Sequence, residues 1–402
     1  MKKTSKQIVK KKKNINFNHI KKTKNLIIVF FLITVFLSMA TYAWFVGMRT
    51  VNITSFDVDI ASTDDLLLSL NGQNWAQEVS ISESTLNTYD GNTNNWGGRG
   101  LIPISTIGEM DQSSSRMKLY EKASLTATKG GYRLLASRID NYSYGVFEQD
   151  GYVVFDLFIK NASGTQYIKE LNPLDEEAIY LTTDSSVTVA SDGVADTGIE
   201  NSVRVAFGEV GRVSGGTTIV KTITGITCSN TEYVTGICRQ AQIWEPNDTK
   251  HILNAINWYN TSCKARTGFN VTLESSYNGS CGTVINNATY PTYAVGNVIT
   301  SGDNVDIYDG YAYNKYTKST LLVNYPYFTD TKKDLMGTVR PTFMTLAPNS
   351  ITKVRIYVYI EGQDIDNYDF ASIGKKITVN FGFTKERFTA TDVDYEGPDL
   401  NQ

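Results

Sequence analysis

The chain has 402 residues and a formal net charge of −3, with 41% hydrophobic and 20% charged residues. These values exclude a wholly disordered chain and leave room for a sizeable folded core. Ten of the 38 basic residues are lysines within the first 24 positions, so the remainder carries about −13 once these ten are taken from the total. Because so acidic a remainder repels nucleic acid, we expect no nucleic-acid partner.

An uncharged segment follows the basic tail. Residues 26–46 read LIIVFFLITVFLSMATYAWFV and contain no charged side chain. As a helix, about 20 apolar residues span the roughly 30 Å hydrocarbon core of a bilayer. We therefore predict a basic cytoplasmic tail over residues 1–24 and a transmembrane or signal helix over residues 25–47, with membrane contact through residues 26–46. A buried core helix is the alternative. The lysines place the acidic part of the chain outside the cell.

The end of this segment also carries a signal-peptidase pattern. Thr41 and Ala43 are small residues at suitable positions for a cut before Trp44. The length of the apolar run favours an uncleaved anchor, because signal-peptide cores are usually about 7–15 residues long. Two localisations stay open: a single-pass membrane protein with its C-terminal domain outside, or a secreted, extracellular protein after cleavage.

Alternation with a period of two residues predicts β-strands in the exported part. The clearest lie over residues 153–160, 203–207, 354–361 and 377–383. Such alternation is typical of antiparallel sheets with one buried and one solvated face. We predict a mainly β fold, an antiparallel jelly-roll-like β-sandwich. Its first part is residues 48–208, its closing strands are residues 337–386, and a flexible acidic tail follows over residues 387–402.

Residues 209–336 differ in composition and are predicted to form an insertion or subdomain. They contain all four cysteines, much Asn, Gly, Ser and Thr, and a candidate helix at 248–259. Outside the membrane, two disulfides are expected. We prefer Cys228–Cys238 with Cys263–Cys281, because residues 226–239 resemble two short strands around a polar turn. Free buried thiols and a zinc site are the alternatives, although no C-x-x-C spacing supports zinc.

The exported part offers few residues for catalysis. Its sole histidine is His251, so an H-E-x-x-H zinc motif cannot form, and we expect His251 to be structural or exposed. Asp364, Asp366 and Asp369 form an acidic loop without the spacing of an EF-hand. We expect solvated carboxylates there, with calcium binding through oxygen ligands as the alternative. We therefore predict no enzyme, no metal and no cofactor.

Several short segments resemble those of a known family. Residues 40–45, ATYAWF, end the hydrophobic run and precede an amphipathic strand. They resemble the export signal of the TasA/camelysin family, surface proteins of low-GC Gram-positive bacteria that a SipW-type signal peptidase processes. Residues 243–247, 356–364 and 377–383 look like segments of exports with this signal. The resemblance implies a jelly-roll surface protein and a matrix-fibre subunit, and camelysin relatives have been classed as metalloproteases.

These observations predict an exported structural protein of the cell surface or the extracellular (biofilm) matrix that acts by protein–protein interaction. After cleavage behind Ala43, strand 51–60 could complete the sheet of a neighbouring molecule and so build fibres. Its partners would be further copies or other surface proteins. One alternative is a membrane-tethered adhesin or ligand-binding module for a glycan or host protein, using the insertion. A secreted hydrolase is the other.

Overall fold

The part of the chain that the structure describes folds mainly into β-sheets, as the alternating sequence predicts. The structure is a computed structural model, and it describes residues 56–62, 65–86, 88–98, 100–128, 131–143, 145–191, 193–257, 293–296, 322–324, 328–330, 340–362, 364, 366–367 and 376–387. All of these belong to the unit Met48–Gln402. The predicted tail, membrane segment and cleavage region (Thr41, Ala43, Trp44) lie outside them. Within these ranges no helix is long and apolar enough to cross a bilayer.

The smaller of the two main sheets contains the first and the last strand that the structure describes. Its strands lie in the order β19-β11-β21-β1-β3, and β12 also pairs with β21. Their bounds are β1 (Phe56–Ser62), β3 (Glu78–Ile81), β11 (Glu177–Leu181), β12 (Ser186–Val189), β19 (Met344–Leu346) and β21 (Ile377–Thr384). The pairing of β1 with β21 is parallel, and the other pairings in this sheet are antiparallel.

The larger sheet is built around three long neighbouring strands. β20 (Ser350–Glu361) pairs with β13 (Val203–Ser214) on one side and with β10 (Val153–Asn161) on the other. The remaining strands are β2 (Leu66–Ser69), β4 (Asn95–Trp96), β5 (Pro103–Ser105), β8 (Tyr120–Thr128), β9 (Gly131–Arg138), β14 (Thr235–Gly236), β15 (Gln242–Glu245) and β18 (Phe328–Asp330). The predicted boundary at residues 208/209 lies inside β13.

Short elements complete the described part of the chain. Two-residue strands β6 (Met110–Asp111) and β7 (Arg116–Met117) form one ribbon, and β16 (Tyr293–Val295) and β17 (Leu322–Asn324) form another. The helical elements are η1 (Glu83–Thr85), η2 (Pro173–Asp175), η3 (Ile199–Asn201) and α2 (Val220–Thr224). The candidate helix at 248–259 begins later than we predict, since helical residues start at 253 and are described to 257.

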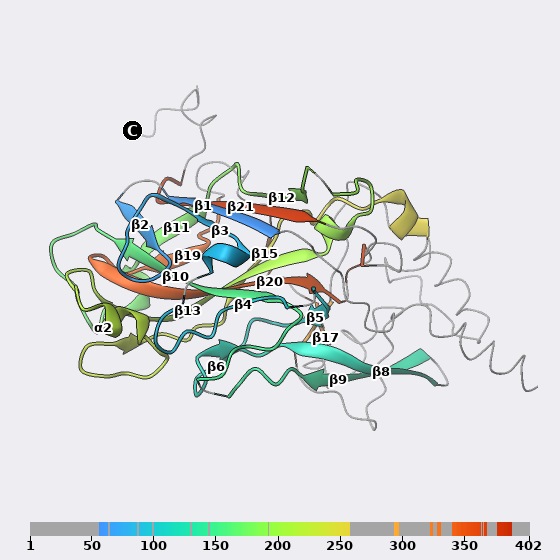
Figure 1. The fold of residues 1–402 in the computed structure, drawn as a ribbon, viewed down its shortest axis with the longest axis horizontal. Coiled ribbons are helices and arrows are strands. Elements are labelled where there is room, and N and C mark those ends of the chain that lie inside the picture. The colour runs from blue at the N-terminus through green and yellow to red at the C-terminus, as the bar shows by residue number, and fades with distance from the viewer. Residues whose placement is uncertain are drawn as a thin grey trace, which may run out of the picture. The chain divides into compact units, whose positions relative to one another are not determined.

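One hydrophobic cluster draws on both main sheets. Val58, Ile60 and Phe381 of the small sheet and Phe155 and Phe207 of the large sheet belong to it, each with 2% exposure or less. The Phe207 ring contacts the Phe381 ring edge-on, with centroids 5.1 Å apart. Burying each such side chain contributes about 1.5–3 kcal/mol. Figure 1 shows the corresponding layering, with β1, β21 and β12 above β20 and β13.

The opposite face of the large sheet is also buried, which corrects our expectation of a solvated face. A second cluster joins Tyr357 and Tyr359 of β20 to residues such as Met117, Leu119 and Tyr152. All 12 residues of β20 are consequently buried. Part of the cover is the ribbon of β6 and β7, which contributes Met110 and Met117 to this cluster. In Figure 1, β6 lies below β20 and β13, as do β8 and β9, which continue the large sheet through β5. Apolar side chains of β20 therefore pack on one face of the sheet, and its polar and aromatic side chains are buried on the other face. Neither face is exposed to solvent along this strand.

The sheets are mixed, and this corrects the expectation of a purely antiparallel arrangement. Three pairings in the described residues are parallel: β1 with β21, β20 with β5, and β15 with β18. A parallel pair needs a long connection between its strands. In the first case the connection contains all the other described strands, because β1 and β21 are the first and last of them.

Candidate interaction site on the small sheet

The first strand after the predicted membrane segment lies inside the small sheet. β1 is hydrogen-bonded on both sides, to β21 and to the short strand β3. Val58 lies opposite Val379 in the parallel register, and Ile60 lies opposite Phe381. Val58 and Ile60 are only 0% and 1% exposed. The strand that we expect to act in assembly therefore closes the sheet and core of its own molecule.

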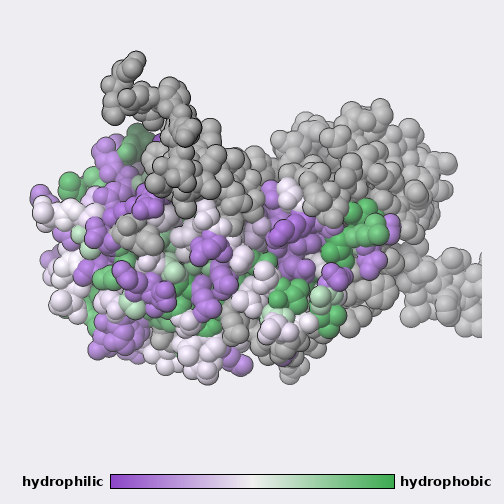
Figure 2. Space-filling view, turned by 90° about the horizontal axis from the view of Figure 1, so that it is seen from above, coloured by the Kyte–Doolittle hydropathy of each residue, from purple (hydrophilic) through white to green (hydrophobic). Residues whose placement is uncertain are grey.

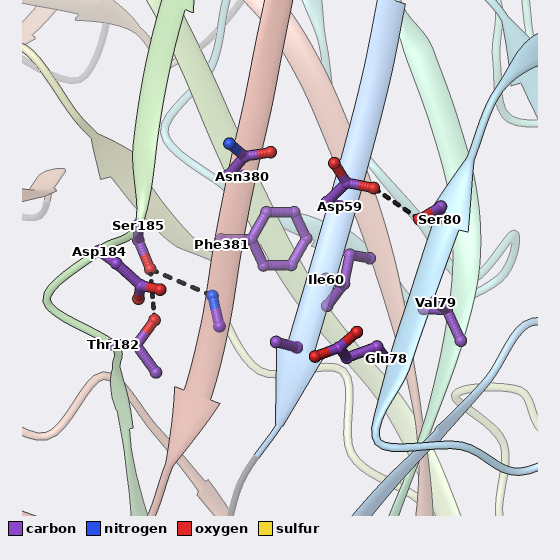
Figure 3. Close-up of a pocket in the computed structure, with 12 residues that line it drawn as sticks. Asp59, Ile60, Glu78, Val79, Ser80, Thr182, Asp184, Ser185, Asn380 and Phe381 are labelled. Carbon is purple, nitrogen blue, oxygen red and sulfur yellow. Dashed lines mark hydrogen bonds between the residues drawn. The ribbon is translucent and has the colours of Figure 1, made fainter.

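The outer face of the same strands carries a groove of about 610 Å³. Because side chains alternate along a strand, the neighbours of the core residues point outward from the sheet. The polar residues that line the groove are Asp59, Glu78, Ser80, Thr182, Asp184, Ser185 and Asn380. Figure 3 shows them around the outer face of β1 and β21, and Figure 2 shows hydrophilic patches interspersed with hydrophobic ones on this side of the molecule.

A turn between β11 and β12 forms one wall of this groove. The Thr182 backbone N–H donates to the Gly382 carbonyl at 2.9 Å, and the Gly382 N–H donates to Ser185 Oγ at 3.1 Å. A Cβ atom at position 382 would lie 2.5 Å from Thr182 Oγ1, so the close approach requires glycine. A glycine within a strand often marks such an approach. Gly382 lies inside the alternating segment 377–383, and this glycine is the one feature of the sequence that indicates the close approach of the turn.

The groove suits a polar or cationic ligand. Asp59, Glu78 and Asp184 are its three charged lining residues, and all three are acidic and exposed. Ser80 Oγ donates to Asp59 Oδ1 at 2.5 Å, so one acceptor oxygen already has a partner. The hydroxyls and carboxylates could hydrogen-bond to sugar hydroxyls or amines. In the described residues, no group of three or more His, Cys, Asp or Glu side chains is placed to hold a metal ion.

The preferred first disulfide is present. Cys228 and Cys238 are bonded, with Cα atoms 5.3 Å apart and ten positions apart in the sequence. The loop that they close contains β14, which pairs with β13. The other pair that we prefer, Cys263–Cys281, lies outside the described residues. The disulfide therefore cross-links a loop beside β13 of the large sheet, and neither cysteine lines the groove.

The acidic loop after β20 is buried and paired, in contrast to the solvated loop that we expected. Asp364 Oδ2 lies 2.5 Å from an Arg204 guanidinium nitrogen, and that arginine also pairs with Glu245. Asp366 Oδ2 lies 2.8 Å from His251 Nδ1, and Asp366 Oδ1 accepts the Ile252 backbone N–H at 3.0 Å. Asp369, the third candidate metal ligand, lies outside the described residues.

The contact between His251 and Asp366 has a structural consequence. Asp366 is fully buried and His251 is 5% exposed. Burial raises the pKa of Asp366, although the hydrogen bond with His251 opposes the shift. The pair joins a residue two positions before helix 253–257 to the loop after β20, 115 positions away. The sequence offered no signal for this pairing, because neither residue lies in a recognisable motif.

A buried ionic cluster on the other face of the large sheet was also missed. Asp156 of β10 and Arg355 of β20 lie directly opposite each other, and Arg355 Nη1 donates to Asp156 Oδ1 at 2.6 Å. Arg355 Nε donates to Glu148 Oε1 at 2.7 Å. These charges hold the pKa of Asp156 at about 2 despite its burial, and they raise the pKa of Arg355. The alternating pattern indicates that Arg355 and Asp156 each point away from the apolar face of their own strand. It cannot show that the two strands are neighbours and that the two side chains meet.

Comparison of the chain with family models, with curated proteins and with solved structures found no match. The geometry of the sheets, the groove and the buried clusters therefore carries the functional argument.

Proposed function

We propose that this protein is an exported structural protein of the cell surface or extracellular matrix that assembles by exchange of its first strand between molecules. The lysine tail and the uncharged segment 26–46 support export, and the ATYAWF segment resembles the TasA/camelysin export signal. We retain the jelly-roll-like sandwich in this proposal, on the ground that both main sheets contribute to one core cluster.

One observation carries the assembly part of the proposal. β1 is a central strand of the small sheet, yet it comes from the N-terminal end of the described domain and pairs in parallel with the last strand. The chain then crosses to the large sheet, where β2 pairs with β10. Moving β1 to a neighbour would leave the pairing of β2 with β10 intact. Exchange of an identical element is a low-cost route to oligomers, and a head-to-tail exchange that does not close produces a fibre.

Exchange conserves the contacts that hold β1 in place. A β1 from a second molecule could bury the same Val58 and Ile60 side chains and form the same ladder with β21 and β3. Because the contacts are the same in both states, the balance between monomer and assembly would then depend mainly on strain in the linker, on linker length and on protein concentration. A molecule whose β1 had left without replacement would expose a core groove and two unpaired strand edges, which favour strand addition.

A reversible covalent lock on β1 tests this proposal. Asp59 and Ser80 lie opposite each other on β1 and β3, and both are exposed. The double variant Asp59→Cys/Ser80→Cys, oxidised as a monomer, should stay monomeric at concentrations where the wild type forms fibres. Reduction should restore assembly. Light scattering and electron microscopy provide the readout.

The matched control bridges the same sheet without holding β1. Thr188 and Thr378 lie opposite each other on β12 and β21, so Thr188→Cys/Thr378→Cys should assemble in both redox states. Fibres from the oxidised Asp59→Cys/Ser80→Cys variant would refute strand exchange. So would a mature wild-type protein that remains monomeric at high concentration.

The groove on the outer face supports a second candidate, a ligand-binding module for a glycan. Its polar lining and its volume of about 610 Å³ suit a sugar unit. In a glycan-array assay, Asp59→Asn/Asp184→Asn should lose binding, whereas the exposed Asp140→Asn variant should keep it. An array without any bound glycan would remove this candidate and leave the assembly proposal unaffected.

A further inference from the structure

A second cavity lies on the other face of the large sheet, away from the groove. It has a volume of about 90 Å³ and is lined by residues of several segments of the chain. The polar side chains that matter here are Ser114, Arg116, Thr224, Lys353 and Arg355. Three of these five are cations, although the exported part of the chain is acidic overall. A small cavity beside several buried cations can bind an anion.

The buried charges around this cavity do not balance. Arg116, Lys353 and Arg355 provide three positive charges, and each is at most 8% exposed. Glu148 and Asp156 provide two negative charges and are 3% and 1% exposed. The five groups contact one another: Lys353 Nζ lies 3.2 Å from Asp156 Oδ2, and Arg116 Nε lies 3.7 Å from Glu148 Oε1. The buried cluster therefore has a net charge of +1.

Neighbouring tyrosines satisfy the carboxylates without changing this charge. Tyr152 donates its hydroxyl to Glu148 at 2.7 Å, and Tyr357 donates to Glu148 at 3.0 Å. Tyr89 donates to Asp156. Burial and the adjacent carboxylates raise the pKa of Tyr89 and of Tyr152, so both phenols remain neutral. An unbalanced buried charge is costly unless a counter-ion accompanies it.

Lys353 is the cation with unused hydrogen-bonding capacity. An ammonium group has three donors. Lys353 Nζ reaches two protein acceptors, the Thr224 carbonyl at 3.2 Å and Asp156 Oδ2 at 3.2 Å. Arg355, in contrast, uses Nε, Nη1 and Nη2 on Glu148, Asp156 and Thr93. Burial lowers the pKa of Lys353, and an anion next to Nζ would oppose that shift.

A second, independent observation concerns Ser114. Its side chain is 6% exposed, lines the same cavity, and its Oγ has no hydrogen-bond partner among the described residues. Buried hydroxyls nearly always have a partner, so this hydroxyl needs one that the described protein atoms do not supply, a water or an ion. Ser114 donates nothing to Asp111, which accepts the Ser114 backbone N–H instead. The hydroxyl proton is available to an acceptor inside the cavity.

We infer that this cavity binds one small monovalent anion, of halide to acetate size, between the Lys353 ammonium group and the Ser114 hydroxyl. The single negative charge matches the excess of +1, and the volume excludes large organic anions. Asp90 is the one acid among the lining residues, and it is exposed. Because Asp90 lies in water, it weakens anion binding only modestly. The ion would act as a structural ligand that locks β20 to the layer covering the large sheet.

Thermal unfolding in different sodium salts tests the inference on the purified full-length chain in a neutral detergent. At constant ionic strength, replacing gluconate with chloride, bromide or acetate should raise the Tm, because these anions bind the folded state. Gluconate is too large for the cavity and is the matched control. Crystals soaked in bromide should show an anomalous peak next to Lys353 Nζ.

Variants separate this site from general salt effects. Ser114→Ala should weaken the apparent anion affinity about tenfold or more, as expected for a lost hydrogen bond to a charged group. Lys353→Met should abolish the dependence on the anion, and Asp90→Asn should strengthen it a few-fold. Lys385→Met, in a partly exposed ion pair with Glu177, is the control and should behave as wild type.

Some outcomes would overturn the inference. Equal Tm values in gluconate and chloride would do so, as would an unchanged anion dependence in Ser114→Ala. If Lys353→Met fails to fold, Ser114→Ala and the bromide peak still decide the question. A bromide-soaked crystal in which the cavity holds only water would refute the site.

Discussion

Glu209 provides a test of the electrostatics of the large sheet. It lies on β13 at a register shift, and it is 6% exposed. Its Oε2 atom lies 3.3 Å from an Arg239 nitrogen but has no hydrogen-bond partner among the described residues. Burial raises the pKa of Glu209 from 4.5 to about 7, although Arg239 opposes the shift. Desolvation therefore outweighs the ion pair at this position.

The sign of the pH dependence follows from this shift. Between about pH 4.5 and 7 the folded state keeps a proton on Glu209 that the unfolded state has released. The associated stability is fully present below pH 4.5 and is lost as the pH rises to about 7. One pKa unit corresponds to about 1.4 kcal/mol, so the loss between these pH values is at most about 3 kcal/mol. Glu209→Gln should avoid that loss, since an amide does not ionise.

Urea unfolding followed by tryptophan fluorescence measures this effect. Glu209→Gln should match the wild type near pH 4 and exceed its unfolding free energy by about 2–3 kcal/mol at pH 8. Glu176 is the matched control, because it accepts hydrogen bonds from Arg239 and Thr345 and its pKa is lowered. Glu176→Gln should therefore lose stability relative to the wild type as the pH rises towards 4.5, and the deficit should stay constant above that pH. A difference for Glu209→Gln that is independent of pH would refute the reasoning.

Three further substitutions test other parts of the structure. Arg355→Met leaves its two buried carboxylate partners without their main counter-charge and should cost about 3–5 kcal/mol in urea unfolding; a cost below about 1 kcal/mol would contradict the ionic cluster. Cys228→Ser/Cys238→Ser opens a loop of about ten residues and should cost about 2–3 kcal/mol, and addition of reductant should destabilise the wild type more than this variant. Gly382→Ala should cost about 1–3 kcal/mol through its contact with Thr182, and Thr182→Ala in the same chain should recover part of it; no recovery would show that the contact is not the cause.

Strand positions were predictable because they depend on local alternation. The patterns at 153–160, 203–207, 354–361 and 377–383 lie within β10, β13, β20 and β21, of which β13 and β20 extend further than the patterns. The disulfide between Cys228 and Cys238 could also be predicted from the sequence, because the two cysteines are ten positions apart, around a polar turn that brings them together. In each case, residues close in the sequence determine the outcome. The solvated face that we assigned to the large sheet was wrong because a second layer, from elsewhere in the chain, covers it.

By itself, the sequence determined the charge asymmetry, the mainly β character and the scarcity of histidine, with His251 alone after residue 47. Only the tertiary structure decided that β1 pairs with β21, that His251 meets Asp366, and that Arg355 meets Glu148. The last contact joins residues 207 positions apart. Alternation assigns a side chain to one of two faces of a strand, but the energy of a buried charge depends on what the rest of the chain places against that face.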